Sequence, residues 1–155
     1  AMFQPDREIV LHEPEDSELI INNQNDKAGI EKYYQDTRDL GAASEEDLSS
    51  LANNLFNLSE SEINSYIQRL QAHIDILNQT PVPSEIVNIQ KLRIAQLRAG
   101  IRMFEIVRDQ YRPEGSGNQF WSDYFYQMVA VREAASLEIL AWKEALDLLK
   151  EQGGL

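Results

Sequence analysis

The two histidines, His12 and His73, are the first side chains to consider for metal chemistry. Carboxylate di-iron sites in helical bundles use a Glu-x-x-His pattern on two helices. The residue three positions before His73 is Leu70, so the pattern is absent there. His73 borders the apolar side of its predicted helix, which is typical of a helix-edge residue. The sequence therefore predicts no metal site and no cofactor.

Nucleophilic and acid–base catalysis are the next chemistries to consider. The chain has no cysteine, which excludes a disulfide framework, a zinc–thiolate site and a cysteine nucleophile. It also has no Gly-x-Ser-x-Gly motif. The carboxylate pairs Glu105–Asp109 and Glu144–Asp147 lie on predicted helices of an acidic protein, where such pairs are usually solvated. No catalytic residue is predicted, and an enzyme of unfamiliar type is the least favoured alternative.

A glycine-rich turn, Gly115-Ser116-Gly117, precedes a predicted helix. Helix N-termini attract anions, so such a turn can bind phosphate. The lysine and the hydroxyl pattern of a P-loop are missing here. The simpler interpretation is that the glycines form the turn and that Ser116 or Asn118 caps the helix.

Two charged residues fall on apolar helix sides. Arg93 lies among isoleucine and leucine residues of one predicted helix, and Glu138 lies beside Trp142 on the apolar side of the next. Burial of either charge alone is costly. If the two helices are antiparallel and joined near Gly115, then Arg93 and Glu138 have nearly the same height, because they are almost equally far from that turn along the chain. We predict a partly buried Arg93–Glu138 ion pair; alternatively, Arg93 extends to the surface and Glu138 faces a groove.

The elements that must position these residues are helices. Apolar residues recur at helical spacing, Ser59 and Glu62 form a capping box, and Pro81 and Pro83 interrupt the pattern. These patterns predict an all-α bundle of four to five helices, with two long antiparallel helices at its C-terminal end. Helices are expected over about 26–40, 44–58, 59–80, 84–111 and 118–151, with breaks near 57–59, 80–83 and 112–117.

Residues 1–25 are predicted to be an acidic N-terminal arm, followed by a single helical-bundle domain over 26–155. Two short runs in the arm, Glu8–His12 and Glu18–Asn22, favour β-structure and flank a turn-like segment. A short β-hairpin is one expectation, and a partly disordered arm is the other, because an isolated hairpin is marginally stable. Any sheet is expected within this arm. The arm could also add a strand to a partner's sheet.

Charge narrows the classes of partner. The net charge is −12, which argues against nucleic acid, because phosphate binding requires a basic surface. Residues 1–62 contain 15 acidic and 4 basic side chains, whereas residues 63–115 contain 5 acidic and 7 basic ones. The acidic first part could stay with the basic middle of the same chain, or it could bind a basic partner protein.

The sequence leaves the cellular location of the protein open. No apolar run long enough to cross a bilayer occurs, so no membrane span is expected. No signal peptide is present, although the leading Ala1-Met2 is typical of a cloning remnant, and a signal or anchor could have been removed. We therefore expect a soluble protein and favour a cytoplasmic location, with secretion or export to the periplasm as the alternative.

Two groups of residues are candidates for partner contacts. Phe125, Val129 and Leu140 lie on a second side of the last helix, away from its main apolar stripe, and Arg98 and Arg102 lie on a basic side of the preceding helix. Together with the acidic charge they favour a non-enzymatic protein that binds a partner protein, such as an immunity-type inhibitor, a chaperone or an adaptor. The alternative is a structural or assembly component, including a homo-oligomer.

Overall fold

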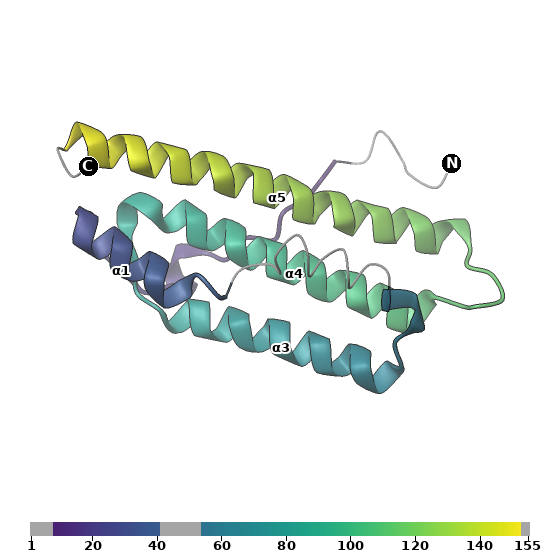
Figure 1. Ribbon diagram of the computed structural model, residues 1–155. Coiled ribbons are helices and arrows are strands. Elements are labelled where there is room, and N and C mark those ends of the chain that lie inside the picture. Colours follow the sequence, from purple (N-terminus) through teal and green to yellow (C-terminus); the bar gives the residue numbers. More distant parts are fainter. Residues whose placement is uncertain (1–7, 41–53, 153–155) are drawn as a thin grey trace.

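The computed structural model describes residues 8–40 and 54–152 of the chain, and its architecture is an all-α bundle (Figure 1). Within those residues there are four α-helices: α1 (Lys27–Thr37), α3 (Glu60–Gln79), α4 (Val87–Gln110) and α5 (Asn118–Glu151). Three short 3-10 turns occur at Asp16–Glu18, Leu55–Asn57 and Ser84–Ile86. The predicted fold class and the pair of long C-terminal helices are confirmed.

Local sequence signals set the helix boundaries. Asp26 caps α1 by accepting a hydrogen bond from the Gly29 N–H at 2.9 Å. Ser59 and Glu62 form the predicted capping box at the start of α3, which satisfies N–H groups that have no partner within the helix. Helix α3 ends at Gln79, before Pro81, and α5 begins directly after Gly117.

Helix α4 is the centre of the bundle. It runs antiparallel to both α3 and α5, which flank it along most of its length (Figure 1). At one end of the bundle an aromatic cluster joins the 3-10 turn before α3 to α4 and α5; it includes Phe56, Phe104, Tyr111, Phe120 and Tyr124. At the other end α1 packs across the last turns of α5 through Ile30 and Tyr33.

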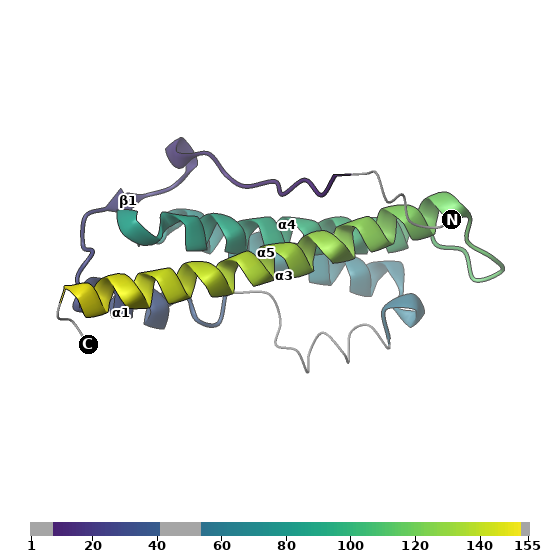
Figure 2. The same cartoon turned by 90° about the horizontal axis from the view of Figure 1, so that it is seen from above.

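The N-terminal arm, which the structure describes from residue 8, runs along the side of α4 that is opposite to α1 (Figure 2). Leu11 packs on Leu92 of α4 and Ala134 of α5, and Leu19 packs between α3 and α4. The chain then turns around the end of the bundle to reach α1. The arm and α1 therefore cover two different faces of the α4–α5 pair.

The predicted hairpin does not form among the described residues of the arm. Instead, strand β1 (Ile21–Asn22) pairs in parallel with β2 (Val82–Pro83), with Ile21 opposite Val82. The Val82 N–H donates to the Ile20 carbonyl at 2.8 Å. The prediction that any β-sheet would lie within the N-terminal arm was therefore wrong, because β2 lies outside it. The pairing joins segments far apart in sequence, so no local turn signal could indicate it.

Some predicted helix limits differ from the structure. Helix α1 ends at Thr37, whose hydroxyl donates to the Tyr33 carbonyl one turn earlier, whereas the sequence suggested 40. The 3-10 turn at Ser84–Ile86 delays the start of α4 to Val87. Most of the helix expected over 44–58 lies outside the described residues. None of the helices in the described segments is both long and apolar enough to cross a membrane.

Candidate functional site

Arg93 and Glu138 lie together in the structure. Arg93 is on α4 with 5% of its surface exposed, and its Nε atom is 3.5 Å from Oε2 of Glu138 on α5. That distance lies within the usual ion-pair limit of about 4 Å. The antiparallel helices bring the two residues to one height, as their positions relative to Gly115 indicated. The two helices are thus connected by charge inside the bundle.

The Glu138 carboxylate has two further partners. Gln96, one turn after Arg93 on α4, donates through Nε2 to Oε1 at 2.6 Å. Trp142, one turn further along α5, donates through Nε1 to Oε2 at 3.1 Å. Both carboxylate oxygens therefore accept hydrogen bonds, which offsets the loss of hydration on partial burial. The Trp142 side chain is itself half-buried.

Helix α1 contributes the remaining contacts of this cluster, through Thr37 and Tyr33. Arg93 Nη1 donates to the hydroxyl of Thr37 at 2.5 Å. The guanidinium carbon also lies 5.6 Å from the ring centre of Tyr33 and 5.5 Å from that of Trp142, which is within range of a cation–π interaction. Sequence reasoning missed Thr37 and Gln96. The only local signal was that Tyr33 and Thr37, one turn apart, share one side of a short helix.

The Tyr33 side chain is buried beside the guanidinium, with 2% of its surface exposed. Its hydroxyl makes no hydrogen bond with the described residues, although Arg93 and Thr37 lie close enough to lower its pKa. Burial has the opposite and larger effect, and it raises the pKa of Tyr33 to about 12. The phenol is therefore neutral at physiological pH.

The cluster connects three helices and offers little access to solvent. Only 6% of the Arg93 side chain and 19% of the Glu138 side chain are exposed. Arg93 is held by Glu138 and Thr37, and Glu138 by Gln96 and Trp142. A substrate would have to displace these contacts to reach the charges. The geometry is that of an internal cross-link, which orients α1 on α4 and α5.

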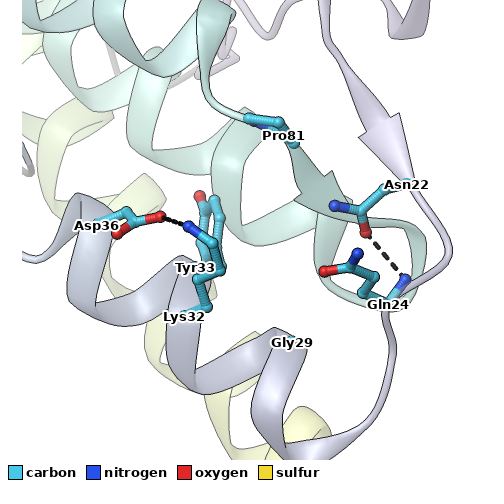
Figure 3. Close-up of a pocket in the computed structure, with 7 residues that line it drawn as sticks. All are labelled: Asn22, Gln24, Gly29, Lys32, Tyr33, Asp36 and Pro81. Carbon is cyan, nitrogen blue, oxygen red and sulfur yellow. Dashed lines mark hydrogen bonds and ion pairs between the residues drawn. The ribbon is translucent and has the colours of Figure 1, made fainter.

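A small hollow of about 180 Å³ lies next to Tyr33, between α1 and the loop that enters it (Figure 3). Its lining includes Asn22, Gln24, Lys32 and Asp36. Lys32 is bound to Asp36 at 2.7 Å, and the Asn22 side chain accepts from the Gln24 N–H at 3.0 Å. Each contact thus lies on one side of the hollow, the first on α1 and the second in the loop before it (Figure 3).

The residues proposed for partner contacts on α5 lie in different surroundings. Phe125 is half-buried and contacts Trp121 and Tyr124 within the aromatic cluster. Val129 is also half-buried. Leu140 has 53% of its surface exposed. Of the three apolar candidates, Leu140 is the one whose side chain is largely available to another molecule.

The basic side of α4 is bound to the arm. Arg98 donates through Nη1 to the His12 carbonyl at 2.8 Å, and Lys91 forms an ion pair with Asp16. Arg102, one turn beyond Arg98, is half exposed and lies 3.6 Å from Glu105. These contacts favour intramolecular attraction between the acidic first part of the chain and the basic middle.

The last turns of α5 present two charged stripes at helical spacing. We define the acidic stripe as positions 133, 137, 140, 144, 147 and 151, all exposed, which carry four carboxylates and two leucines: Glu133, Leu137, Leu140, Glu144, Asp147 and Glu151. The neighbouring basic stripe contains three bases, one serine and two exposed apolar residues: Arg132, Ser136, Ile139, Lys143, Leu146 and Lys150. Residues spaced by three or four positions align on one helix face. Among these residues, the sequence had indicated Leu140 as a candidate partner contact and Glu144 with Asp147 as a solvated carboxylate pair.

Metal-ligating side chains do not gather in the described part of the chain: no group of three histidine or carboxylate residues there could hold an ion. No protein-family model, no curated protein sequence and no solved structure matches this chain. Inference about its role therefore rests on the geometry of the molecule itself.

Proposed function

We propose that the protein is a non-enzymatic binding module that recognises a partner protein through the acidic stripe of α5. The observation that carries this proposal is the stripe itself. Leu137 and Leu140, with 37% and 53% of their surfaces exposed, lie between exposed carboxylates on the same helix face. No ion pair joins Glu133, Glu144 or Asp147 to a described residue.

The chemistry of the stripe specifies the kind of partner. Burial of the two leucines on association supplies affinity, at roughly 25 cal/mol per Å² of apolar surface. The carboxylates favour a partner surface rich in lysine or arginine and accelerate its approach. A basic amphipathic helix, with an apolar strip between its charges, fits such a face. The net charge of −12 also favours a basic partner.

The closed cluster around Arg93 supports binding over catalysis. Its charges serve to join α1, α4 and α5. Catalytic groups usually lie in a cleft where a substrate can reach them. Here the polar contacts of the interior maintain the architecture, and the exposed side chains of α5 supply the binding surface.

A second candidate function is self-assembly, and the basic stripe favours it. Two copies of α5 that pack in parallel about a two-fold axis would place the basic stripe of each against the acidic stripe of the other. Lys143 would then lie near Glu144 of the second copy. Ile139, which has 59% of its surface exposed, and Leu140 would be buried in the same contact.

The test compares three full-length proteins: wild type, Glu144→Lys/Asp147→Lys in the acidic stripe, and Asp75→Lys/Glu114→Lys as a control with the same change in net charge. Affinity capture from the native source, followed by titration of the purified captured protein, should show binding to the wild type and the control. Reversal of charge in the stripe should weaken that binding at least tenfold.

Two further measurements, the salt dependence of the affinity and the self-association of each protein, distinguish the possible outcomes. Affinity that falls as salt rises supports the electrostatic contribution. Sedimentation of each protein alone tests assembly: a dimer that the stripe variant loses supports self-assembly, and a monomer at high concentration argues against it. Equal binding by the stripe variant and the control would contradict the proposed surface.

A further inference from the structure

We infer that the surface of α4 and α5 beneath residues 8–16 is a binding site for an extended acidic peptide from a partner protein, and that the N-terminal arm occupies it as an internal competitor. This site lies apart from the acidic stripe and carries the opposite charge preference. The inference therefore stands independently of the function proposed above.

This surface of α4 and α5 holds the main chain of its occupant. Tyr126 of α5 accepts a hydrogen bond from the Val10 N–H at 2.7 Å and donates one to the Glu8 carbonyl. Arg98 of α4 donates to the His12 carbonyl. Backbone groups are common to every peptide, so these contacts fix an extended conformation without requiring particular side chains.

Apolar anchoring comes from few residues. Leu11 packs against Leu92 and Ala95 of α4 and Ala134 of α5. Pro14 is buried three positions later. Proline lacks a backbone N–H and favours extended conformations, so it suits a segment that contributes no regular ladder of hydrogen bonds. The occupant needs a leucine and a proline at this spacing.

Charge gives the site its preference for acids. The Lys91 ammonium is paired with Asp16, and this hydrogen bond, with the nearby Glu13 and Glu15, raises the pKa of Lys91. Arg98 lies two turns further along α4. The surface thus presents cations on α4 to a segment that is rich in carboxylates.

The arm can leave without disrupting the bundle. Among residues 8–18, Pro14 is buried, Ile9 and Leu11 are half-buried, and the others are exposed. Segments with so little buried surface open by local unfolding while the core stays folded. A second copy of the arm would gain nothing over the arm already in place, whereas a partner with additional contacts could displace it. We therefore assign the competing segment to a partner protein.

The test uses a fluorescent peptide with the sequence of residues 8–18 and full-length proteins. In the wild type, the attached arm competes at high effective concentration, so peptide binding is weak. Leu11→Asp removes the apolar anchor of the attached arm, and Asp16→Lys repels Lys91 from an exposed position that does not disturb folding. Each variant should bind the peptide at least tenfold more tightly than the wild type does.

Two controls define the site. Adding Arg98→Gln to Asp16→Lys should reverse the gain, and a peptide of equal charge with serine in place of Leu11 should bind at least tenfold more weakly. The inference is overturned if Asp16→Lys, folded by circular dichroism, binds the peptide no better than wild type does, or if both peptides bind equally. A dimer of Asp16→Lys in sedimentation would also overturn it, in favour of exchange between copies.

Discussion

At the scale of single residues, the Arg93–Glu138 pair shows how a charged pair is accommodated inside a helical bundle. Each charged side chain contacts the other and at least one neutral side chain, which is Thr37 for Arg93 and Gln96 for Glu138. The net contribution of such a pair is small when compared with apolar residues of the same volume, but loss of one member leaves a buried charge behind. The two single substitutions and the double substitution should therefore differ in a characteristic way.

Arg93→Met should lower the free energy of unfolding by about 3–5 kcal/mol, because Glu138 then keeps its charge without a cation. The double variant Arg93→Met/Glu138→Leu should be more stable than the sum of the two single effects indicates. Urea unfolding followed by circular dichroism measures all three. Additive effects would mean that the two side chains do not interact.

Tyr33 provides a pH-dependent signal. Its pKa is raised to about 12 in the folded protein, compared with an ordinary value near 10. The unfolded chain therefore releases the phenol proton at lower pH than the folded one does, and stability falls as pH rises above 10. The stability that depends on the neutral Tyr33 phenol is fully present below pH 10, and it is lost as the pH rises to 12.

Relative to Tyr33→Phe, the wild type should lose about 2 kcal/mol of stability between pH 10 and pH 12. Tyr33→Phe should be as stable as the wild type at pH 7, or more stable, because it removes a buried hydroxyl without a hydrogen-bond partner among the described residues. Urea unfolding at several pH values tests this. An identical alkaline decline in both proteins would refute the assignment to Tyr33.

At the scale of elements, α1 is held by a close contact between Gly29 and the backbone of Gln24, as well as by Arg93. A Cβ atom at Gly29 would lie 2.1 Å from the Gln24 carbonyl oxygen, which is backbone and cannot move aside as a flexible side chain could. Glycine is thus needed where the loop from β1 folds back over the first turn of α1. At Gly100 in α4 the nearest atom would be Leu70 Cδ1 at 3.5 Å, an ordinary contact.

These two glycines provide a matched comparison. Gly100→Ala should stabilise the protein by up to about 1 kcal/mol, because alanine favours helix more than glycine does. Gly29→Ala should destabilise it in spite of the same helical preference, because the loop must shift. Thermal unfolding of both variants measures the difference. A stabilised Gly29→Ala protein would show that the loop around Gln24 yields easily.

At the scale of the whole molecule, the described elements differ in how much surface they bury. Helix α4 has neighbours on several sides: α3, α5, the arm and, through Arg93, α1. In contrast, β1 and β2 form two residue pairs, and the arm is mostly exposed. Such differences produce local opening well below the free energy of global unfolding.

Native-state hydrogen exchange should therefore rank the elements. The amides of the middle of α4 are expected to exchange slowest, at the rate set by global unfolding, with α1 faster and the Val10 amide of the arm faster still. Mass spectrometry of exchanged fragments resolves these regions. Protection of the arm equal to that of α4 would contradict this ranking, and it would also weaken the inference that the arm can be displaced.

Local sequence was enough to specify the helices and much of their pairing. Capping by Ser59 and Glu62, the break at Pro81 and the glycine turn before α5 act over short stretches of chain, so they can be recognised locally. The common height of Arg93 and Glu138 followed from counting positions along two antiparallel helices. These features depend on the repeat of the helix and on short connections.

The path of the arm, the pairing of Ile21 with Val82 and the participation of Thr37 and Gln96 in the cluster around Arg93 became known only from the packed structure. An extended segment has no helical repeat that fixes which face it packs on, and its hydrogen bonds go to residues far away in sequence. Helical hydrogen bonds are local, whereas contacts of the arm with Arg98 and Tyr126 exist only once α4 and α5 have packed.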